Sequence, residues 1–333
     1  MEPREIPIES FGPATTLRVR AASAKDPGPG EVAIDVAYSG INFADIQMRL
    51  GFYPDAPKKP FIPGYEVAGT IAAVGREVTG FTVGQPVVAG TYFGGYTSRA
   101  VIPAIQAFAL PGHLDLAQGA ALPVNYFTAR LALAEMARVR AGDRVLIECA
   151  TGGVGVLAIQ LARHLGAEVT GLTTSPSKLG FLEGLGAKAM TKEAWLADAS
   201  ATGYDFILNA SGGAEIAPQR KRLAITGRMV CIGLSSGVKD GRRNFLRMGL
   251  AALRTPRISV LKLFDDNSGI FALNALKVLE DPTWVARLTQ SIGLVEALAL
   301  TPHVGKVFPA AQVADAHHLL ETKGATGKVL LAW

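Results

Sequence analysis

Residues 143–177 limit the possible folds of this chain more than any other stretch. An apolar, β-branched run at 145–149 is followed by a glycine-rich turn at 152–155. Apolar residues then recur at helical spacing, and a second strand-like run covers 169–172. This order predicts a strand, a tight turn, a helix and a second strand, as in an α/β fold with a doubly wound parallel sheet.

The glycine turn predicts a dinucleotide site. Glycine lets the backbone approach a pyrophosphate closely, and the free N–H groups at the start of the following helix face the phosphate oxygens. The spacing GGVG followed by Ala158 is a variant of the GxGxxG/A fingerprint. A glycine cluster alone also suits a plain loop, but this one stands between a strand and a helix. We therefore assign the pyrophosphate to Gly152, Gly153, Val154 and Gly155.

The residues after the second strand bear on which dinucleotide is bound. NAD-binding units usually carry Asp or Glu there, about 20 residues beyond the glycines. This chain has Thr173, Thr174 and Ser175, with Lys178 just beyond, whereas Glu168 stands at the other end of the strand. Hydroxyls and an ammonium group suit a 2′-phosphate, and a charge-assisted contact contributes ~1.5–3 kcal/mol. We predict NADPH in preference to NADH; the alternative is a solvated turn that discriminates little.

Length and composition suit two domains with substantial cores. The chain has 333 residues, of which 49% are hydrophobic and 18% charged. Charges and prolines at 1–20 exclude a signal peptide, and no uncharged apolar run reaches membrane-spanning length, so we expect a soluble, cytoplasmic protein. The two cysteines, Cys149 and Cys231, lie in apolar runs, and we expect small core residues rather than a disulfide.

The net charge of +5 is unevenly spread. Residues 239–262 hold one acid, Asp240, and seven basic residues: Lys239, Arg242, Arg243, Arg247, Arg254, Arg257 and Lys262. Interleaved apolar side chains make part of the stretch amphipathic, and we interpret it first as a solvated helical insertion. The alternatives are weak contact with an anionic membrane surface and steering of an anionic ligand. No aromatic platform or reading motif accompanies the charge, so we expect no nucleic-acid partner.

The order of the remaining segments predicts two domains. Residues up to about 120 form short glycine- and proline-rich strands, typical of a barrel-like β domain. Strands at 205–213 and 227–237 are followed by turns on the ligand side of the sheet, which brings Gly233 and Leu234 toward the nicotinamide half of the cofactor. The later segments are a strand at 268–276, a helix at 283–298, a short segment at 303–309, a helix at 310–323 and a strand at 327–333. We predict one domain from 1–121 and 288–333 and a second from 122–287.

Six motifs carry a resemblance to a known family: NFADIQMRLGFYP, IPGYEVAGTIAAVG, FGGYTSRAVIPA, AALPVNYFTA, ATGGVGVLAIQLARHLGA and VADAHHLLETKGATGKVLL. Together they resemble the medium-chain dehydrogenase/reductase superfamily, and within it the zinc-independent quinone oxidoreductase branch. Two stretches are also similar to the synaptic-vesicle membrane protein homologues and to the enoyl reductase domains of polyketide synthases. The resemblance implies a Rossmann NADPH-binding domain, a GroES-like β-barrel-type catalytic domain and oxidoreductase activity.

The resemblance also implies that no zinc is bound. Zinc-dependent members place a cysteine after Gly-Ile and a histidine in Gly-His-Glu, where this chain has Asn42 and Tyr65. Two distant cysteines cannot supply a four-cysteine structural site, and the five histidines lack partners at ligand spacing. We therefore predict no metal site.

The resemblance further implies site residues. The catalytic cleft would contain Asn42, Asp45 and Tyr53; Thr128 would approach the nicotinamide, and Ser175 with Lys178 the 2′-phosphate. Two positions depart from the family pattern: Gln47 stands where many relatives have tyrosine, and Thr191-Lys192 replaces a tyrosine near the third strand. Lys192 would either contact the 2′-phosphate or stay exposed to solvent. Plain alternatives are that Asn42 caps a turn, that Asp45 pairs with Arg49 and that Tyr53 is a packed aromatic residue.

We predict an NADPH-dependent oxidoreductase that transfers hydride to a quinone or an α,β-unsaturated carbonyl. This reaction needs alignment of the reactants and a dry cleft but no metal. Asn42 or Tyr53 would donate a hydrogen bond to the acceptor oxygen. One alternative is reduction of an enoyl thioester on coenzyme A or an acyl carrier protein. An alternative of another class is a low-turnover nucleotide-binding protein that acts by membrane or partner association. The resemblance also implies a homodimer joined through the last strand of the sheet, here 268–276, whose unpaired edge would otherwise be exposed.

Overall fold

Residues 143–177 form the strand, turn, helix and strand that their pattern predicts. The computed structural model describes residues 2–235, 241 and 244–333. The end of the expected strand 227–237 and the basic residues Lys239, Arg242 and Arg243 lie outside the described residues. Two compact units make up the chain: unit 1 is Met1–Val124, Lys239–Arg243 and Leu276–Trp333, and unit 2 is Asn125–Val238 and Asn244–Ala275. The predicted domain limits after residues 121 and 287 stay a prediction.

Unit 2 is built on a six-stranded parallel sheet. In sheet order its strands are β10 (Lys188–Thr191), β9 (Glu168–Thr173), β8 (Arg144–Ile147), β11 (Tyr204–Asn209), β12 (Leu223–Cys231) and β13 (Gly269–Ala272). The chain moves outward from β8 to β10 and then returns to add β11 on the other side of β8. This is the 3-2-1-4-5-6 order of the Rossmann fold, so the predicted fold class is confirmed. The order reverses between β8 and β11, the switch point where such sheets bind ligands.

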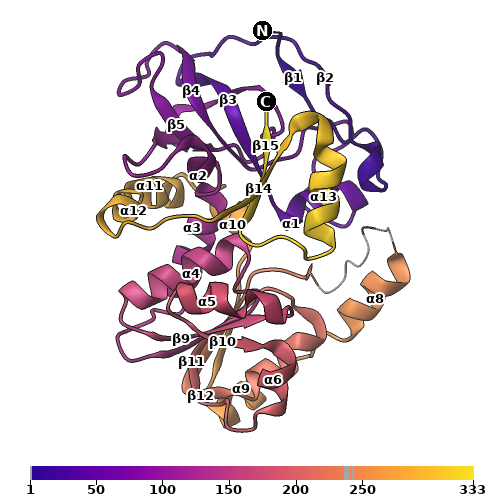
Figure 1. Ribbon diagram of the computed structural model, residues 1–333, viewed down its shortest axis with the longest axis vertical. Helices are drawn as coiled ribbons and strands as arrows, with labels where there is room; N and C mark the ends of the chain where they lie inside the picture. Colours follow the sequence, from indigo (N-terminus) through magenta and orange to yellow (C-terminus); the bar gives the residue numbers. More distant parts are fainter. Residues whose placement is uncertain (1, 236–240, 242–243) are drawn as a thin grey trace. The chain divides into compact units, whose positions relative to one another are not determined.

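Helices pack on the apolar strands of unit 2, and α4 is in contact with both β8 and β9 (Figure 1). The helices that lie wholly or mostly in this unit are α3 (Pro123–Arg130), α4 (Gly153–His164), α5 (Leu179–Gly184), α6 (Lys192–Ala197), α7 (Ile216–Arg220), α8 (Phe245–Leu253) and α9 (Val260–Asp266). Single turns precede or extend them: the π-helical η3 (Leu131–Met136), η4 (Pro176–Lys178) and η5 (Gly213–Glu215). The core between the layers includes Leu146, Ile207 and Met229, all fully buried.

Unit 1 contains a seven-stranded sheet to which both ends of the chain contribute. Its strands are β3 (Glu31–Ile41), β4 (Glu66–Val74), β5 (Pro86–Gly90), β6 (Arg99–Pro103), β7 (Ala107–Ala109), β14 (Val304–Pro309) and β15 (Lys328–Ala332), beside a separate pair, β1 (Arg4–Glu5) and β2 (Arg20–Ala21). The C-terminal β15 pairs with β3, and Figure 1 shows it in yellow beside the indigo and purple strands. This pairing places Val329, near the start of β15, opposite Ile41 at the end of β3.

The helices of unit 1 connect its strands, and some of them pack against the sheet. They are α1 (Phe43–Leu50), α2 (Leu116–Ala120), α10 (Ala275–Val278), α11 (Pro282–Gln290), α12 (Gly293–Ala297) and α13 (Val313–Glu321), with the short turns η1 (Ala14–Thr16), η2 (Ala104–Gln106) and η7 (Ala310–Gln312). No helix in residues 2–235, 241 and 244–333 is both long and apolar enough to cross a membrane.

Three expectations about local structure are corrected. The strand predicted at 268–276 pairs with β12 only over β13, and α10 begins at Ala275. The helix predicted at 283–298 is two helices, because the backbone changes to i−3 hydrogen bonds between them, from the N–H of Ile292 to Thr289 (3.1 Å) and from that of Leu294 to Ser291 (3.0 Å). Cys149 is exposed rather than in the core: β8 ends at Ile147, and Cys149 has a φ of 53° in the turn that follows.

Buried polar groups join α1 to α13 in unit 1. The guanidinium of Arg49, fully buried, pairs with Glu321 and donates to the carbonyl of Gly12 (2.8 Å). The ring nitrogen Nε2 of His317 lies 3.0 Å from the Tyr96 hydroxyl. Burial, reinforced by the charge of Arg49, lowers the pKa of His317 to about 3. The imidazole is therefore neutral in the folded protein at physiological pH.

We predict that His317 makes the protein less stable in acid. Its pKa in the unfolded chain is near 6.5, so from pH 6.5 down to about 3 the unfolded state binds a proton that the folded state does not. The free energy of unfolding should therefore fall with decreasing pH by ~1.4 kcal/mol per pH unit from this group. In His317→Gln, which keeps an acceptor for Tyr96, urea unfolding between pH 4 and 6 should show a shallower slope.

The neighbouring His318 is exposed and provides the matched control. Its side chain meets water in the folded and the unfolded chain, so His318→Gln should keep the wild-type slope. Equal slopes in His317→Gln and the wild type would contradict the assigned role of His317.

Candidate functional site

The glycine turn of unit 2 requires glycine because other backbone and side-chain atoms approach it closely. A Cβ on Gly155 would lie 2.6 Å from the Cα of Ala150, and one on Gly153 would lie 2.4 Å from the Nδ2 of Asn125. Gly152 precedes the first turn of α4, and its N–H donates to the carbonyl of Cys149 (2.9 Å). These close approaches leave no room for a Cβ at Gly153 or Gly155, and glycine at the start of the helix is what the close approach of a pyrophosphate requires.

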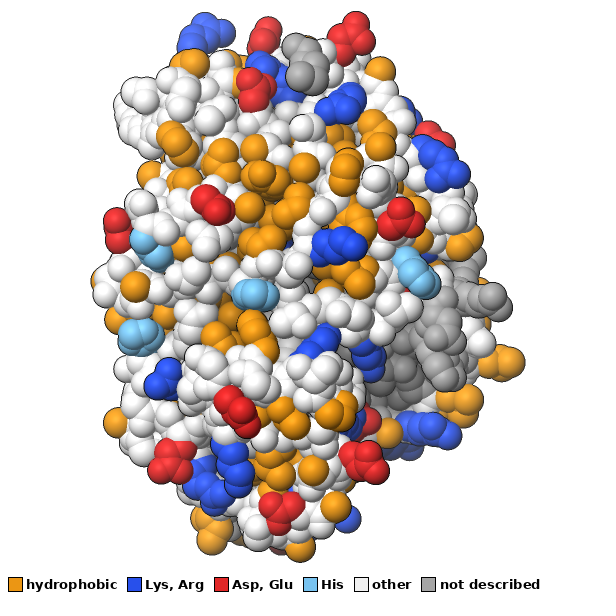
Figure 2. Space-filling model, viewed as in Figure 1, with side chains coloured by type: hydrophobic (Ala, Val, Ile, Leu, Met, Phe, Trp, Pro, Cys, Tyr) orange, Lys and Arg blue, Asp and Glu red, His pale blue; other side chains and the backbone are white. Residues whose placement is uncertain are grey.

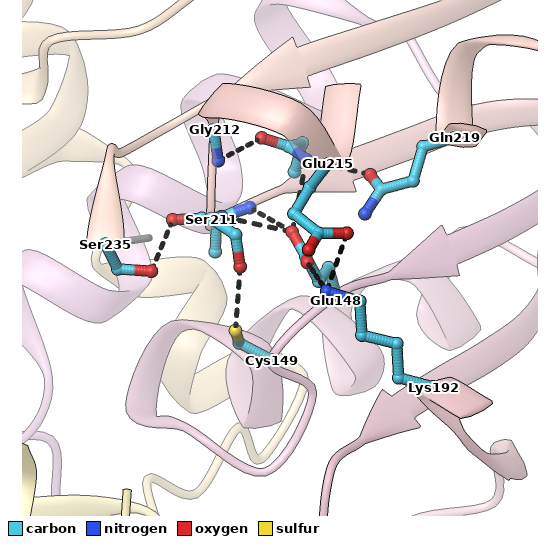
Figure 3. Close-up of polar contacts among 10 residues, drawn as sticks. Glu148, Cys149, Lys192, Ser211, Gly212, Glu215, Gln219 and Ser235 are labelled. Atoms are coloured by element: carbon cyan, nitrogen blue, oxygen red, sulfur yellow. Dashed lines mark hydrogen bonds and ion pairs between the residues drawn. The ribbon is translucent and has the colours of Figure 1, made fainter. Parts of the chain in front are cut away.

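The carboxylate of Glu148 joins the ends of β8 and β11 at the switch point (Figure 3). Its Oε2 accepts from the N–H groups of Ala210 (3.0 Å) and Ser211 (3.0 Å) and from the amide of Asn209 (3.2 Å). Asn209 in turn accepts from the N–H of Gly212 (2.8 Å) through its Oδ1. One buried carboxylate therefore fixes the loop that follows β11.

The loop after β12 packs against the loop after β11. A Cβ on Gly212 would lie 2.6 Å from the carbonyl oxygen of Gly233 and 2.8 Å from a methyl carbon of Leu234. Ser235 donates to the carbonyl of Ala210 (3.2 Å). The structure thus brings Gly233 and Leu234 to the carboxyl ends of β11 and β12, where the sequence analysis expected them, and their contact with nicotinamide stays a prediction.

A pocket of about 430 Å³ lies at the ends of β9 and β10. Its lining residues are Thr174, Pro176, Thr191, Lys192, Glu193 and Leu196. The pocket brings together Thr174, one of the residues predicted to bind the cofactor, and Lys192, whose contact with the 2′-phosphate the sequence left open. Ser175 and Lys178 flank Pro176 in the chain without lining the pocket, and burial lowers the pKa of Lys178. Thr128 is buried in α3.

Lys192 lines the pocket, and its ammonium group also pairs with carboxylates. Its ammonium lies 2.6 Å from Oε2 of Glu215 and 3.6 Å from Oε1 of Glu148 (Figure 3). Sequence reasoning missed both carboxylates as partners of Lys192, because Glu148 precedes the glycine turn and Glu215 lies 23 positions beyond Lys192.

In unit 1, Asn42 belongs to a buried polar cluster with Lys328 and Glu66. Lys328 donates to Oδ1 of Asn42 (2.5 Å) and pairs with Glu66, while Nδ2 of Asn42 donates to Oε1 of Glu66 (3.0 Å). The other carboxylate oxygen of Glu66 accepts from the N–H of Val124 (2.8 Å). Lys328, on β15, was missed by sequence reasoning because it lies 286 positions from Asn42.

Asp45 fixes the backbone around this cluster. Its carboxylate accepts from the N–H of Asn42 (2.7 Å), which caps α1, and from the N–H of Gly64 (3.0 Å). Burial raises the pKa of Asp45 to about 7. The alternative that Asp45 pairs with Arg49 is wrong, because Arg49 pairs with Glu321.

Tyr53 is half-buried and belongs to an aromatic cluster. Its ring centre lies 6.4 Å from that of Tyr65, which in turn lies 5.5 Å from Phe93. Burial raises the pKa of Tyr53, so its hydroxyl stays protonated and able to donate. Gln47 lies in α1.

The donor set of unit 1 does not fit zinc. The two positions at which the resemblance implies ligands hold Asn42 and Tyr65, and Glu66 is already paired with the ammonium of Lys328. Across the described part of the chain, no group of three or more His, Cys, Asp or Glu side chains is placed to hold a metal ion. By contrast, the glycine turn and its switch point do fit a nicotinamide dinucleotide.

Comparisons with known proteins agree with this fold. Residues 28–112 match the alcohol dehydrogenase GroES-like domain, and residues 185–331 match a domain described as zinc-binding dehydrogenase. The chain is 30% identical over 322 residues to the synaptic vesicle membrane protein VAT-1 homolog of Rattus norvegicus, covering 95% of this chain and 80% of that protein. It is 29% identical to the quinone oxidoreductase of Homo sapiens, covering 98% and 97%.

A solved mycobacterial protein complexed with NADPH superimposes with a TM-score of 0.85 at 25% identity, over 99% of this chain and 100% of that one. The chain belongs to the medium-chain dehydrogenase/reductase superfamily, whose members are oxidoreductases that bind a nicotinamide cofactor.

We predict that Gly155→Ala damages the dinucleotide site. The added methyl would meet the Ala150 backbone at 2.6 Å, and overpacking of this kind costs ~1–3 kcal/mol of stability. Urea unfolding should show that loss, and fluorescence titration should show weakened dinucleotide binding.

Gly180→Ala is the matched control, because a Cβ there meets nothing within 4 Å and the residue is helical. It should leave binding unchanged and stability equal or slightly higher. Equal behaviour of the two variants would contradict the packing argument for Gly155.

Proposed function

We propose that the protein is an NADPH-dependent oxidoreductase that transfers hydride to a quinone or an α,β-unsaturated carbonyl without a metal ion. The observation that carries the proposal is the Lys328–Asn42–Glu66 cluster, in which an ammonium group pairs with Glu66 where zinc-dependent relatives would place metal ligands. The identity with quinone oxidoreductase across nearly the whole chain supports the same reaction type.

The cofactor would be held by unit 2. The glycine turn at the start of α4, Gly152–Gly155, suits the pyrophosphate, and the pocket with Thr174 and Lys192 suits a phosphate on the adenosine ribose. No acidic residue ends β9: Thr173 is there instead, and its hydroxyl accepts from the N–H of Ser175 (3.2 Å). A ribose 2′-OH would lack its usual carboxylate partner, which favours NADPH over NADH. The NADPH complex of the mycobacterial relative supports this choice.

The residues of unit 1 would serve the acceptor. Lys328 and Glu66 fix the amide of Asn42 so that one N–H of Nδ2 is bound to Glu66 and the second is left to donate to an acceptor oxygen. The protonated hydroxyl of Tyr53 is a second candidate donor. NADPH, when bound, supplies a hydride, and the acceptor takes one proton from water, so that a quinone becomes a hydroquinone or an enone becomes a saturated carbonyl. Asn42 and Tyr53 stabilise the negative charge that develops on the oxygen.

We predict that the purified protein oxidises NADPH in the presence of quinones or enones, and that Asn42→Ala lowers kcat by about 100-fold, the effect of removing one oxyanion donor. The assay follows NADPH absorbance against a panel of quinones, enones and enoyl thioesters. Dissociation constants for NADPH serve as the control: Asn42 lies in unit 1 and the glycine turn in unit 2, so the constant should change less than about twofold.

The same panel decides between the proposed functions. If the enoyl thioester is turned over fastest, the substrate assigned to the protein becomes a thioester of coenzyme A or of a carrier protein. NADPH binding without consumption of any acceptor would overturn the enzymatic proposal. Joined with salt-sensitive sedimentation on anionic liposomes, that result would favour membrane association. The similarity to a vesicle membrane protein and the exposed Phe245, Leu246 and Leu253 of α8 motivate that alternative. On the face that Figure 2 shows, hydrophobic and basic side chains lie next to one another in several places.

We also propose a homodimer formed through β13. This strand is the last in the sheet order of unit 2, so its outer edge is able to pair with a second copy. Phe271 on β13 is 41% exposed, which is high for an aromatic side chain within a sheet.

We predict that light scattering gives twice the mass of the chain, and that Phe271→Lys shifts the protein toward the monomer, because a lysine on an edge strand opposes edge-to-edge pairing. Val83→Lys adds the same charge at an exposed apolar position of unit 1 and should leave the dimer intact. A monomeric wild type, or equal effects of both variants, would contradict the interface at β13.

A further inference from the structure

Lys192 is a cation that lines the pocket at the ends of β9 and β10, and its ammonium group is shared with two carboxylates. The ammonium of Lys192 lies 2.6 Å from Glu215 and 3.6 Å from Glu148, so two negative charges face one positive charge. The Lys192 side chain starts at the first residue of α6, at the pocket, and reaches over the strand ends to these carboxylates (Figure 3). An anion in the pocket would have to compete for the same ammonium group.

The two carboxylates differ in how tightly they are held. Oε2 of Glu148 accepts three hydrogen bonds from the loop after β11, and the side chain is only 3% exposed. Glu148 therefore keeps its position whether or not Lys192 is near. The side chain of Glu215 is 28% exposed, so water is able to replace the ammonium group when the pair opens. Glu215 is the exchangeable partner.

The backbone that carries Glu215 is nevertheless fixed. The N–H of Glu215 donates to the carbonyl of Gly212 (3.2 Å), and Gly212 is tied to Asn209 at the end of β11. Opening of the pair therefore requires only side-chain rotation of Lys192 and Glu215, at little cost to the sheet.

We propose that Glu215 is a specificity-determining residue that competes with the 2′-phosphate of the cofactor for Lys192. The proposal rests on the proposed function, since it assumes that this pocket receives the phosphate-bearing ribose. On binding, Lys192 exchanges the Glu215 carboxylate for the phosphate, and Glu148 remains as a fixed anchor beside it. Glu215 thereby weakens NADPH binding while leaving NADH binding unaffected, and so sets the ratio of the two affinities.

The test measures dissociation constants for NADPH and NADH, by fluorescence titration of the full chain at constant ionic strength, in four variants. In Glu215→Gln, NADPH should bind about fivefold more tightly, the size expected for removal of a partly exposed ion pair. In Lys192→Met, NADPH should bind at least about tenfold more weakly, because a charge-assisted contact is lost. NADH should change less than about twofold in both variants.

The double variant Lys192→Met/Glu215→Gln separates competition from general electrostatics. If Glu215 acts through Lys192, the Glu215→Gln gain disappears in the Lys192→Met background. Glu183→Gln is the matched charge control, because Glu183 is an exposed acid of unit 2 that does not belong to the pocket lining. It should change NADPH binding less than about twofold. A gain that persists without Lys192, that is equal for NADH, or that Glu183→Gln reproduces would overturn the inference.

Failure of the underlying cofactor proposal gives a different result. If the wild type binds NADPH no more tightly than NADH, the proposed cofactor preference is wrong. Glu215→Gln then decides the inference alone: a selective gain for NADPH supports it, and no gain overturns it.

Discussion

The carboxylate of Glu148 is the interaction on which the ligand side of unit 2 depends. The ends of β8 and β11 are neighbours in the sheet but 61 positions apart in the chain, so no short loop connects them. Oε2 of Glu148 accepts three N–H groups across this junction, and each hydrogen bond to a charged group contributes ~1.5–3 kcal/mol. The glycine turn follows Glu148 directly, so both loops of the switch point take their positions from one side chain. Its Oε1 makes no hydrogen bond within the described residues and faces Lys192.

Unit 1 also contains a buried carboxylate, and a buried ammonium group pairs with it. Glu66 is fully buried, and an unpaired carboxylate there would be strongly destabilising, by ~3–5 kcal/mol. Lys328 neutralises it and also bonds to Oδ1 of Asn42, which fixes the orientation of the amide. Glu66, Lys328 and the amide of Asn42 then bond to one another, and among the described residues the second N–H of that amide has no hydrogen-bond partner. That remaining donor is the basis for proposing Asn42 as the group that meets the acceptor oxygen.

The sequence predicts local structure that depends on neighbouring residues in the chain, and it misses contacts between residues that meet only in the folded protein. The strand, glycine turn and helix of 143–177 are local, and they lead correctly to the parallel sheet and its nucleotide-binding class. The position of Cys149 was wrong because the pattern of apolar residues runs two positions past the end of β8. Lys328 and Glu215 were missed, since nothing near them in the chain shows that they meet Asn42 and Lys192. Both are common surface residue types, and only the sheet order turns them toward a site.

The two lysine–carboxylate pairs differ in exposure, and this difference assigns them different tasks. The side chains of Lys328 and Glu66 are 4% and 0% exposed, so separating them would leave both charges without water. That buried pair therefore suits a fixed part of the scaffold. The side chains of Lys192 and Glu215 are 22% and 28% exposed, so either group is able to exchange its partner for water or for an anion at small cost. The partly exposed pair, Lys192 with Glu215, suits a response to a ligand. The buried pair, Lys328 with Glu66, suits the orientation of a hydrogen-bond donor.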